Sequence, residues 1–259
     1  MKIILSGYGK MGRLIERRAL EKGHKVMAVI DPVAEKNAGE QGARIFKTIN
    51  DFEKEQTALD CIAFDFSRPD AAEQNIRNFA ERRIPVVVGT TGWYSKLGEL
   101  SSLIEKNKSS MLWASNFSIG VNLFYRIAGY CAAQIDPYSE YDVGGYEIHH
   151  NQKADSPSGT AKTLVDIVLK NMKRKKKVVW DKLDRPPNSD EIHFASLRVG
   201  AEPGTHGLIF DSPADSIEIK HTARNREGLV YGAITAAEWL EKNTRAGRHG
   251  IFTMDDIFE

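Results

Sequence analysis

One short segment of the sequence holds three side chains that can carry a proton. Residues 147–161 read E-I-H-H-N-Q-K-A-D-S-P-S-G-T-A and contain the imidazoles of His149 and His150 and the amine of Lys153. Imidazole and amine groups can hold or release a proton near neutral pH when their surroundings shift the pKa. A reduction that adds a proton to carbon needs such a group, so the segment indicates an acid–base site.

The end of the same segment predicts the start of a helix. Ser158 and Thr160 precede an apolar-periodic stretch, and serine or threonine commonly caps a helix. With the helix beginning near Gly159, hydroxyls and free backbone N–H groups could bind a substrate carboxylate there. Ser158, Gly159 and Thr160 are therefore candidate substrate contacts.

Two other interpretations of this segment stay open from the residues alone. It could be a polar loop that ends in a capping sequence and contains no catalytic group. His149 and His150 could also bind a metal ion, but neighbouring strand residues point to opposite faces and rarely share one ion. We therefore expect no metal site.

A glycine-rich turn near the N-terminus predicts dinucleotide binding. It follows an apolar strand and precedes a helical pattern, where its glycines would allow a tight turn and close approach of a pyrophosphate. Asp31 closes the second strand 19 residues beyond Gly12, where a carboxylate can bind ribose hydroxyls. The expected contacts are Gly7, Tyr8, Gly9, Lys10, Met11, Gly12, Arg13 and Asp31.

The choice between NADH and NADPH stays open from these residues. Asp31 favours NADH, since a carboxylate there would repel a 2′-phosphate. Lys10, Arg13 and Lys36 could neutralise that phosphate, although basic residues near a helix start are as often plain solvated surface.

Two later turns are candidates for the nicotinamide end of the cofactor. Each follows an apolar strand, and ligands of open α/β sheets bind at the carboxyl ends of such strands. Taken singly, each turn is more often a plain loop. The candidate residues are Gly89, Thr90, Thr91, Ala114, Ser115, Asn116 and Phe117.

The elements that would position these residues alternate regularly in the first half of the chain. Apolar β-rich runs at 3–6, 26–31, 61–65 and 85–89 alternate with helical patterns, as in a parallel sheet with helices on both faces. Beyond residue 118 the pattern changes to strand-like runs separated by turns, which predicts an α+β domain on a mixed sheet. We expect an α/β protein with a Rossmann dinucleotide-binding domain, residues 1–118 plus 228–259, and a substrate-binding and oligomerisation domain, residues 119–227.

The composition excludes several classes of partner. Lys and Arg total 36 against 35 Asp and Glu, so no strong field favours nucleic acid or an anionic membrane. The basic run 173–177 is interpreted as the solvated end of a helix. No apolar stretch approaches the roughly 20 residues of a membrane helix, and the two cysteines form neither a disulfide framework nor a zinc motif. We expect a cytoplasmic protein.

Nearly the whole chain resembles the 4-hydroxy-tetrahydrodipicolinate reductase family, also called dihydrodipicolinate reductase. The most specific match is E-x-H-H-x-x-K-x-D-x-P-S-G-T-A at 147–161. Supporting matches lie at 89–92, at 115–122 and between 232 and 240. The chain departs from the family's commoner G-x-x-G-x-x-G loop by one residue fewer before Gly9, which leaves the cofactor preference open.

The resemblance implies an NAD(P)H-dependent reduction of a cyclic, unsaturated imine dicarboxylate in lysine and diaminopimelate biosynthesis. It implies that His149 is the general acid, that Lys153 is a second proton donor, and that the protein is a homotetramer. Ser158 and Arg226 are weaker candidate contacts, since for each an exposed polar residue is at least as common as a ligand. The substrate-binding residues implied are His150, Lys153, Ser158, Gly159 and Thr160. Two rivals remain, namely another Rossmann dehydrogenase acting on a small amino acid or semialdehyde, and a non-catalytic NADH-sensing protein.

Overall fold

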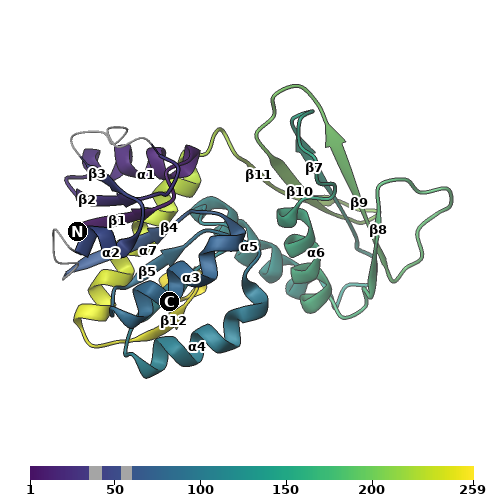
Figure 1. Ribbon diagram of the computed structural model, residues 1–259. Helices are drawn as coiled ribbons and strands as arrows, with labels where there is room; N and C mark the ends of the chain where they lie inside the picture. Colours follow the sequence, from purple (N-terminus) through teal and green to yellow (C-terminus); the bar gives the residue numbers. More distant parts are fainter. Residues whose placement is uncertain (35–42, 54–59) are drawn as a thin grey trace. The chain divides into compact units, whose positions relative to one another are not determined.

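A computed structural model describes residues 1–34, 43–53 and 60–259, so Lys36 lies outside the described residues. The chain divides into two compact units (Figure 1). Unit 1 comprises Met1–Ile119 and Glu227–Glu259, and unit 2 comprises Gly120–Arg226. Each unit has its own sheet and its own buried core.

Unit 1 is built on a seven-stranded sheet in the order β12-β6-β5-β4-β1-β2-β3, in which every neighbouring pair is parallel. The chain crosses over after β3, so that β1 lies between β2 and β4, as expected of a Rossmann sheet. The strands are β1 (Lys2–Ser6), β2 (Lys25–Ile30), β3 (Arg44–Phe46), β4 (Cys61–Asp65), β5 (Val86–Val88), β6 (Ser110–Trp113) and β12 (Gly250–Phe252).

Helices cover both faces of this sheet, because successive side chains of a strand point to opposite faces. Ile3 and Leu5 of β1 pack in one buried cluster with residues of α1 and α7, whereas Ile4 packs in a second cluster with residues of α3 and α4. The near-continuous apolar strands are therefore explained by burial on both faces. The helices are α1 (Lys10–Glu21), α2 (Ile49–Glu53), α3 (Pro69–Glu81), α4 (Leu97–Lys106) and α7 (Glu227–Arg245), with short 3₁₀ turns η2 (Tyr94–Lys96) and η3 (Asp255–Ile257).

Unit 2 is an α+β domain with a five-stranded mixed sheet in the order β11-β10-β7-β9-β8. β10 runs antiparallel to β7 and β11, while β9 runs parallel to β7 and β8. The expected fold class is thus confirmed for both units. The strands are β7 (Asp142–His149), β8 (Lys177–Trp180), β9 (Glu191–Arg198), β10 (Thr205–Asp211) and β11 (Ser216–Thr222).

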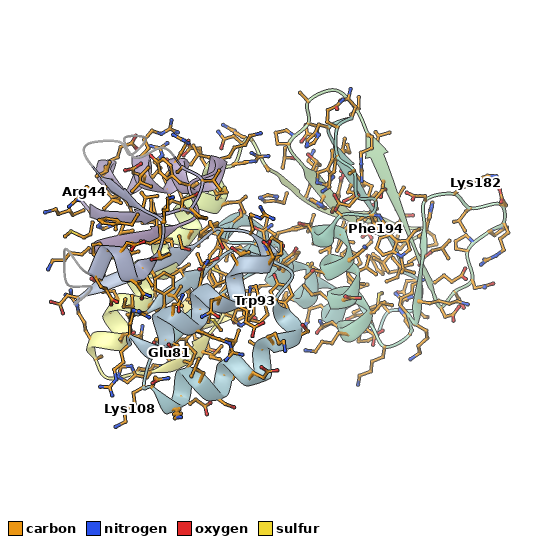
Figure 2. All side chains as sticks on the ribbon, in the orientation of Figure 1. Arg44, Glu81, Trp93, Lys108, Lys182 and Phe194 are labelled. Carbon is orange, nitrogen blue, oxygen red and sulfur yellow. The ribbon has the colours of Figure 1, made fainter. Side chains whose placement is uncertain are left out.

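Two helices, α5 (Ile119–Ile135) and α6 (Gly159–Asn171), contribute to the core of unit 2. Phe194 of β9, labelled in Figure 2, is fully buried and packs in one cluster with Phe124 of α5 and Leu164 of α6. Side chains that point to the opposite face of the sheet are more exposed to solvent: Leu197 is 55% exposed and Ile209 is 37% exposed. The sheet therefore has one face under helices and an opposite face that carries exposed apolar side chains.

One expectation about the basic run 173–177 is wrong. Helix α6 ends at Asn171, and Lys175 is 2% exposed rather than solvated. Its Nζ donates to the carbonyls of Ser189 (2.9 Å) and Glu191 (2.7 Å) and to the Asp142 carboxylate (2.5 Å). Lys175 therefore links the loop before β9 to the start of β7 through these contacts. No helix among the described residues is both long and apolar enough to cross a membrane.

Candidate active site

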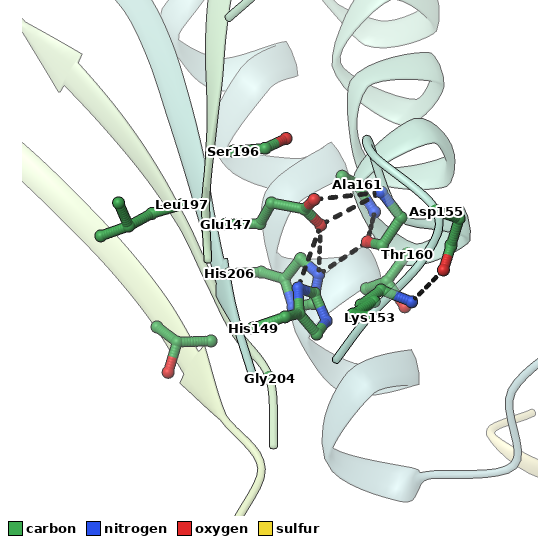
Figure 3. Close-up of polar contacts among 12 residues, drawn as sticks. Glu147, His149, Lys153, Asp155, Thr160, Ala161, Ser196, Leu197, Gly204 and His206 are labelled. Carbon is green, nitrogen blue, oxygen red and sulfur yellow. Dashed lines mark hydrogen bonds and ion pairs between the residues drawn. The ribbon is translucent and has the colours of Figure 1, made fainter. Parts of the chain in front are cut away.

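The segment with His149, His150 and Lys153 runs from the end of β7 to the start of α6. β7 ends at His149, and α6 begins at Gly159, close to the predicted start. The hydroxyl of Ser158 accepts a hydrogen bond from the backbone N–H of Ala161 at 3.1 Å, so Ser158 is the helix N-cap. Figure 3 shows Thr160 and Ala161 at the start of α6 beside Glu147 of β7 and His206 of β10.

Glu147 is the centre of a buried polar cluster. Its side chain is fully buried and accepts hydrogen bonds from the Ser158 backbone N–H (3.1 and 3.3 Å) and from Nη2 of Arg198 (3.0 Å). Burial alone would raise the pKa of Glu147. Contacts with His206, Ser158 and Arg198 outweigh burial and hold this pKa well below its usual range, so the carboxylate is ionised.

Two imidazoles lie against this carboxylate. Nδ1 of His149 is 3.5 Å from Oε2 of Glu147, and Nε2 of His206 is 3.4 Å from the same oxygen. The two rings meet edge to face, with centroids 5.0 Å apart. Burial lowers the pKa of His149 to about 4, although the Glu147 carboxylate acts in the opposite direction. His149 is therefore neutral near pH 7 in the free protein.

The loop between β7 and α6 carries the remaining candidates for acid–base chemistry and substrate binding. Nζ of Lys153 donates to Oδ1 of Asp155 at 2.6 Å, and this contact lowers the pKa of Asp155. Gly159 is exposed at the first turn of α6, while His150 and Thr160 are half-buried. The Ser158 hydroxyl also lies 3.2 Å from Nε2 of His206, so it is already engaged in the cluster. Arg226 is exposed at the end of unit 2.

The cluster offers donor atoms of the kinds that bind metal ions. Glu147, His149 and His206 each present one such atom, and these atoms lie within 4.8 Å of one another. Both oxygens of Glu147 already accept hydrogen bonds, and the Arg198 guanidinium adds a positive charge beside them. A divalent cation would have to displace or repel this guanidinium, so the arrangement favours hydrogen bonding within the protein over metal ligation.

The glycine turn of unit 1 has the local geometry that a pyrophosphate needs. Gly7 has φ +91°, and a Cβ there would lie 2.5 Å from the carbonyl oxygen of Phe66. A Cβ on Gly12 would lie 2.2 Å from the Gly7 carbonyl oxygen, whereas one on Gly9 would meet nothing within 4 Å. Two glycines therefore allow close packing of the turn, and the third leaves open space at the start of α1.

Both carboxylate oxygens of Asp31 accept hydrogen bonds from backbone N–H groups. Oδ2 accepts from the Tyr8 N–H at 2.7 Å, and Oδ1 accepts from the N–H groups of Val33 (2.9 Å) and Ala34 (3.0 Å). A cavity of about 580 Å³ lies beside it, lined in part by Gly7, Gly9, Asp31, Lys47 and Arg68. These contacts fix the glycine turn against the end of β2.

The other predicted cofactor contacts of the glycine turn and of α1 differ in their burial. The Tyr8 side chain is buried and its hydroxyl donates to Glu16, while the Arg13 guanidinium lies 4.4 Å from the centre of the Tyr8 ring. Lys10 is exposed and Met11 is half-buried.

The turns after β5 and β6 are only partly exposed to solvent. The Thr90 hydroxyl is buried and donates to Oδ1 of Asp65 at 2.5 Å, and Phe117 is buried with its ring centroid 5.8 Å from that of Phe66. The Thr90 N–H also donates to the Asp65 carbonyl at 3.2 Å, and the Thr90 carbonyl accepts from Nε1 of Trp93 at 2.7 Å, so the polar groups of Thr90 are engaged within the protein. Thr91 and Ser115 are exposed, while Gly89, Ala114 and Asn116 are half-buried.

Three residues of the buried cluster were not predicted as site residues from the sequence: Glu147, Arg198 and His206. Arg198 and His206 reach the site through strand pairing, since His149 is in register with Arg198 of β9, and Glu147 with His206 of β10. The sequence around His206 shows no metal-site spacing and so predicts a packing or surface role, whereas the structure places this ring against Glu147. The available signal was the two-residue spacing of Glu147 and His149, which places both on one face of a strand.

Comparison with known proteins identifies the family. Residues 1–117 match the family described as dihydrodipicolinate reductase, N-terminus, and residues 120–258 match dihydrodipicolinate reductase, C-terminus. The chain belongs to the dihydrodipicolinate reductase family. A family member named 4-hydroxy-tetrahydrodipicolinate reductase from Christiangramia forsetii is 39% identical over 99% of this chain and 97% of the relative. One from Archaeoglobus fulgidus is 36% identical over the full length of both chains.

Solved structures agree with this family on the fold. A dipicolinate-bound dihydrodipicolinate reductase from Paenisporosarcina sp. TG-14 superimposes with a TM-score of 0.79 at 19% identity, covering 98% of this chain and 97% of that one. An amine dehydrogenase from Mycobacterium smegmatis superimposes with a TM-score of 0.65 at 14% identity, covering 98% and 95%. Since the fold is shared with other dehydrogenases, the function has to be inferred from the family and the site.

Proposed function

We propose that this protein catalyses the NAD(P)H-dependent reduction of 4-hydroxy-tetrahydrodipicolinate to tetrahydrodipicolinate, a step of lysine and diaminopimelate biosynthesis. Family membership over both parts of the chain supports this reaction. The observation that carries the proposal at the site is His149, a buried imidazole against an ionised carboxylate and next to the capped start of α6. An acid and an anion-binding helix end are what a dicarboxylate reduction requires.

In this proposal, unit 2 is the substrate-binding and oligomerisation domain. His149 is the general acid, and Lys153 is a second proton donor. Since His149 is neutral near pH 7 in the free protein, a dianionic substrate has to raise its pKa and draw a proton onto the ring. His150, Lys153 and the backbone of 158–160 bind substrate carboxylate. Ser158 contributes through its backbone position, because its hydroxyl caps α6.

Unit 1 is the dinucleotide-binding domain. The open space at Gly9 and the N-terminus of α1 fit a pyrophosphate, and the cavity beside Asp31 fits the adenosine half. The bound nicotinamide would supply a hydride to the substrate ring. Asp31 favours NADH, while exposed Lys10 and Arg13 are available to a 2′-phosphate, so we propose NADH or NADPH as the cofactor.

A direct assay tests this function. The substrate is generated in situ by condensing pyruvate with aspartate semialdehyde, and loss of NADH or NADPH absorbance is followed with the purified protein. We expect substrate-dependent oxidation of at least one cofactor, and the ratio of the two kcat/KM values gives the preference. Absence of oxidation with both cofactors would refute the proposed reaction.

A further inference from the structure

We infer that Glu147 and Gly204 are positioning residues that act on opposite sides of the His149 ring. Glu147 favours a hydrogen on Nδ1, and Gly204 places no side chain against Nε2, so that Nε2 takes up the second proton when the substrate binds and then delivers it. The inference rests on the proposed function for the direction of proton delivery. The tautomer of His149, in contrast, is a property of the substrate-free protein.

A negatively charged carboxylate, that of Glu147, is held in place beside Nδ1 of His149. Glu147 is ionised and fully buried; its Oε1 accepts hydrogen bonds from the Ser158 N–H and from Arg198, and its Oε2 accepts from the same Ser158 N–H at 3.3 Å. Oε2 lies 3.5 Å from Nδ1 of His149. Nδ1 makes no hydrogen bond with a described residue, so the carboxylate acts on it through its charge, which in a buried site stabilises the ring form that carries its hydrogen on Nδ1.

The other charged groups near His149 do not reverse this preference. Lys153, Arg198 and His206 all disfavour a second proton on the ring, and Glu147 alone favours it. The neutral ring therefore keeps a single hydrogen, and the carboxylate decides which nitrogen carries it. His206 meets the same oxygen through Nε2, at 3.4 Å, and its ring packs edge to face on His149, which limits rotation of that ring.

Gly204 lies on the opposite side of the ring, just before β10. A Cβ on Gly204 would lie 3.0 Å from Nε2 of His149 and 3.3 Å from Cδ2. The residue has φ +151°, which L side chains rarely adopt. β10 pairs with β7 directly after this point, with Thr205 opposite Ile148. The backbone thus passes close to the imidazole (Figure 3), and a side chain at position 204 would lie against Nε2.

The test measures the tautomer of His149 by ¹⁵N–¹H NMR of histidine-labelled protein at pH 7 without substrate. His149→Gln assigns the signal by its disappearance. We expect wild type to carry the hydrogen on Nδ1. In Glu147→Gln the population should shift towards the Nε2–H form, because the negative charge is lost. Glu140→Gln, an exposed glutamate that precedes β7, is the matched control and should leave the tautomer unchanged.

Turnover provides the second readout. Glu147→Gln should lower kcat by about 10- to 100-fold, as is typical when a residue that orients a histidine is removed. Gly204→Ala should keep the Nδ1–H tautomer, because Glu147 is intact, but lower kcat by at least about tenfold through the Cβ beside Nε2. Glu140→Gln should turn over like wild type.

Two results would overturn the inference. One is wild-type His149 carrying its hydrogen on Nε2, a measurement that needs neither the Glu147 nor the Gly204 variant to fold. The other is Gly204→Ala with undiminished kcat. A protein that oxidises neither cofactor would refute the proposed reaction while leaving the tautomer result standing, so the two failures are distinguishable.

Discussion

At His149, burial and a neighbouring carboxylate act on the same imidazole in opposite directions. Burial has the larger effect and lowers the pKa of His149 to about 4, while Glu147 favours the charged form. A general acid with this pKa is unprotonated near pH 7, so the proton has to arrive together with an anionic ligand. The chemistry of the residue therefore depends on what binds beside it.

The first prediction concerns this proton uptake. Pyridine-2,6-dicarboxylate, a cyclic dianion, should raise the pKa of His149 from about 4 and so take up a fraction of a proton per site at pH 6 to 7. Isothermal titration in buffers of different ionisation enthalpy measures this uptake, which should shrink in His149→Gln. Binding without proton exchange, or with proton release, would argue against His149 as the group that meets the dianion.

At the scale of elements, the alternating apolar runs and helical patterns predict the parallel sheet of unit 1 because its strands are buried on both faces. Short strands such as β3, β8 and β12, of three or four residues, carry too little periodicity to be predicted. The start of α6 is predictable because capping is local. The positions of Arg198 and His206 depend on strand register, which a single sequence does not specify.

The burial of Lys175 likewise could not be predicted from the sequence alone, and it gives the second prediction. Its sequence neighbours suggest a solvated basic run, yet its ammonium binds two backbone carbonyls and Asp142. Lys175→Met should destabilise the protein by about 2–4 kcal/mol, because the buried carbonyl of Glu191 and the carbonyl of Ser189 lose their donor. Lys173→Met changes an exposed residue of the same run and should cost less than about 0.5 kcal/mol. Urea unfolding of both variants measures the difference, and equal stabilities would contradict the assigned role.

At the scale of the whole molecule, unit 2 presents an uncovered sheet face in a protein that we propose to be a homotetramer. Ile148 and Leu197 lie opposite each other on paired strands, and Ile209 lies on the same face of β10. Exposed apolar side chains grouped on one sheet face are typical of an interface between subunits.

The third prediction follows from this face. Light scattering should give wild type a mass four times the 29.0 kDa of one chain. Leu197→Asp should reduce that mass, because an aspartate in an apolar interface loses its hydration. Tyr138→Asp, which changes an exposed apolar residue outside the sheet, is the control and should not alter the mass. A Leu197→Asp protein of wild-type mass would exclude this face as the interface.

The central claim is that His149 supplies the proton in a reduction by a nicotinamide cofactor. The most direct measurement compares kcat of His149→Gln with wild type in the substrate-dependent oxidation assay, together with the cofactor Kd by fluorescence. We predict a loss of about 10² to 10⁴ in kcat, the usual contribution of a positioned proton donor, with an unchanged cofactor Kd. Undiminished turnover by His149→Gln would contradict the claim.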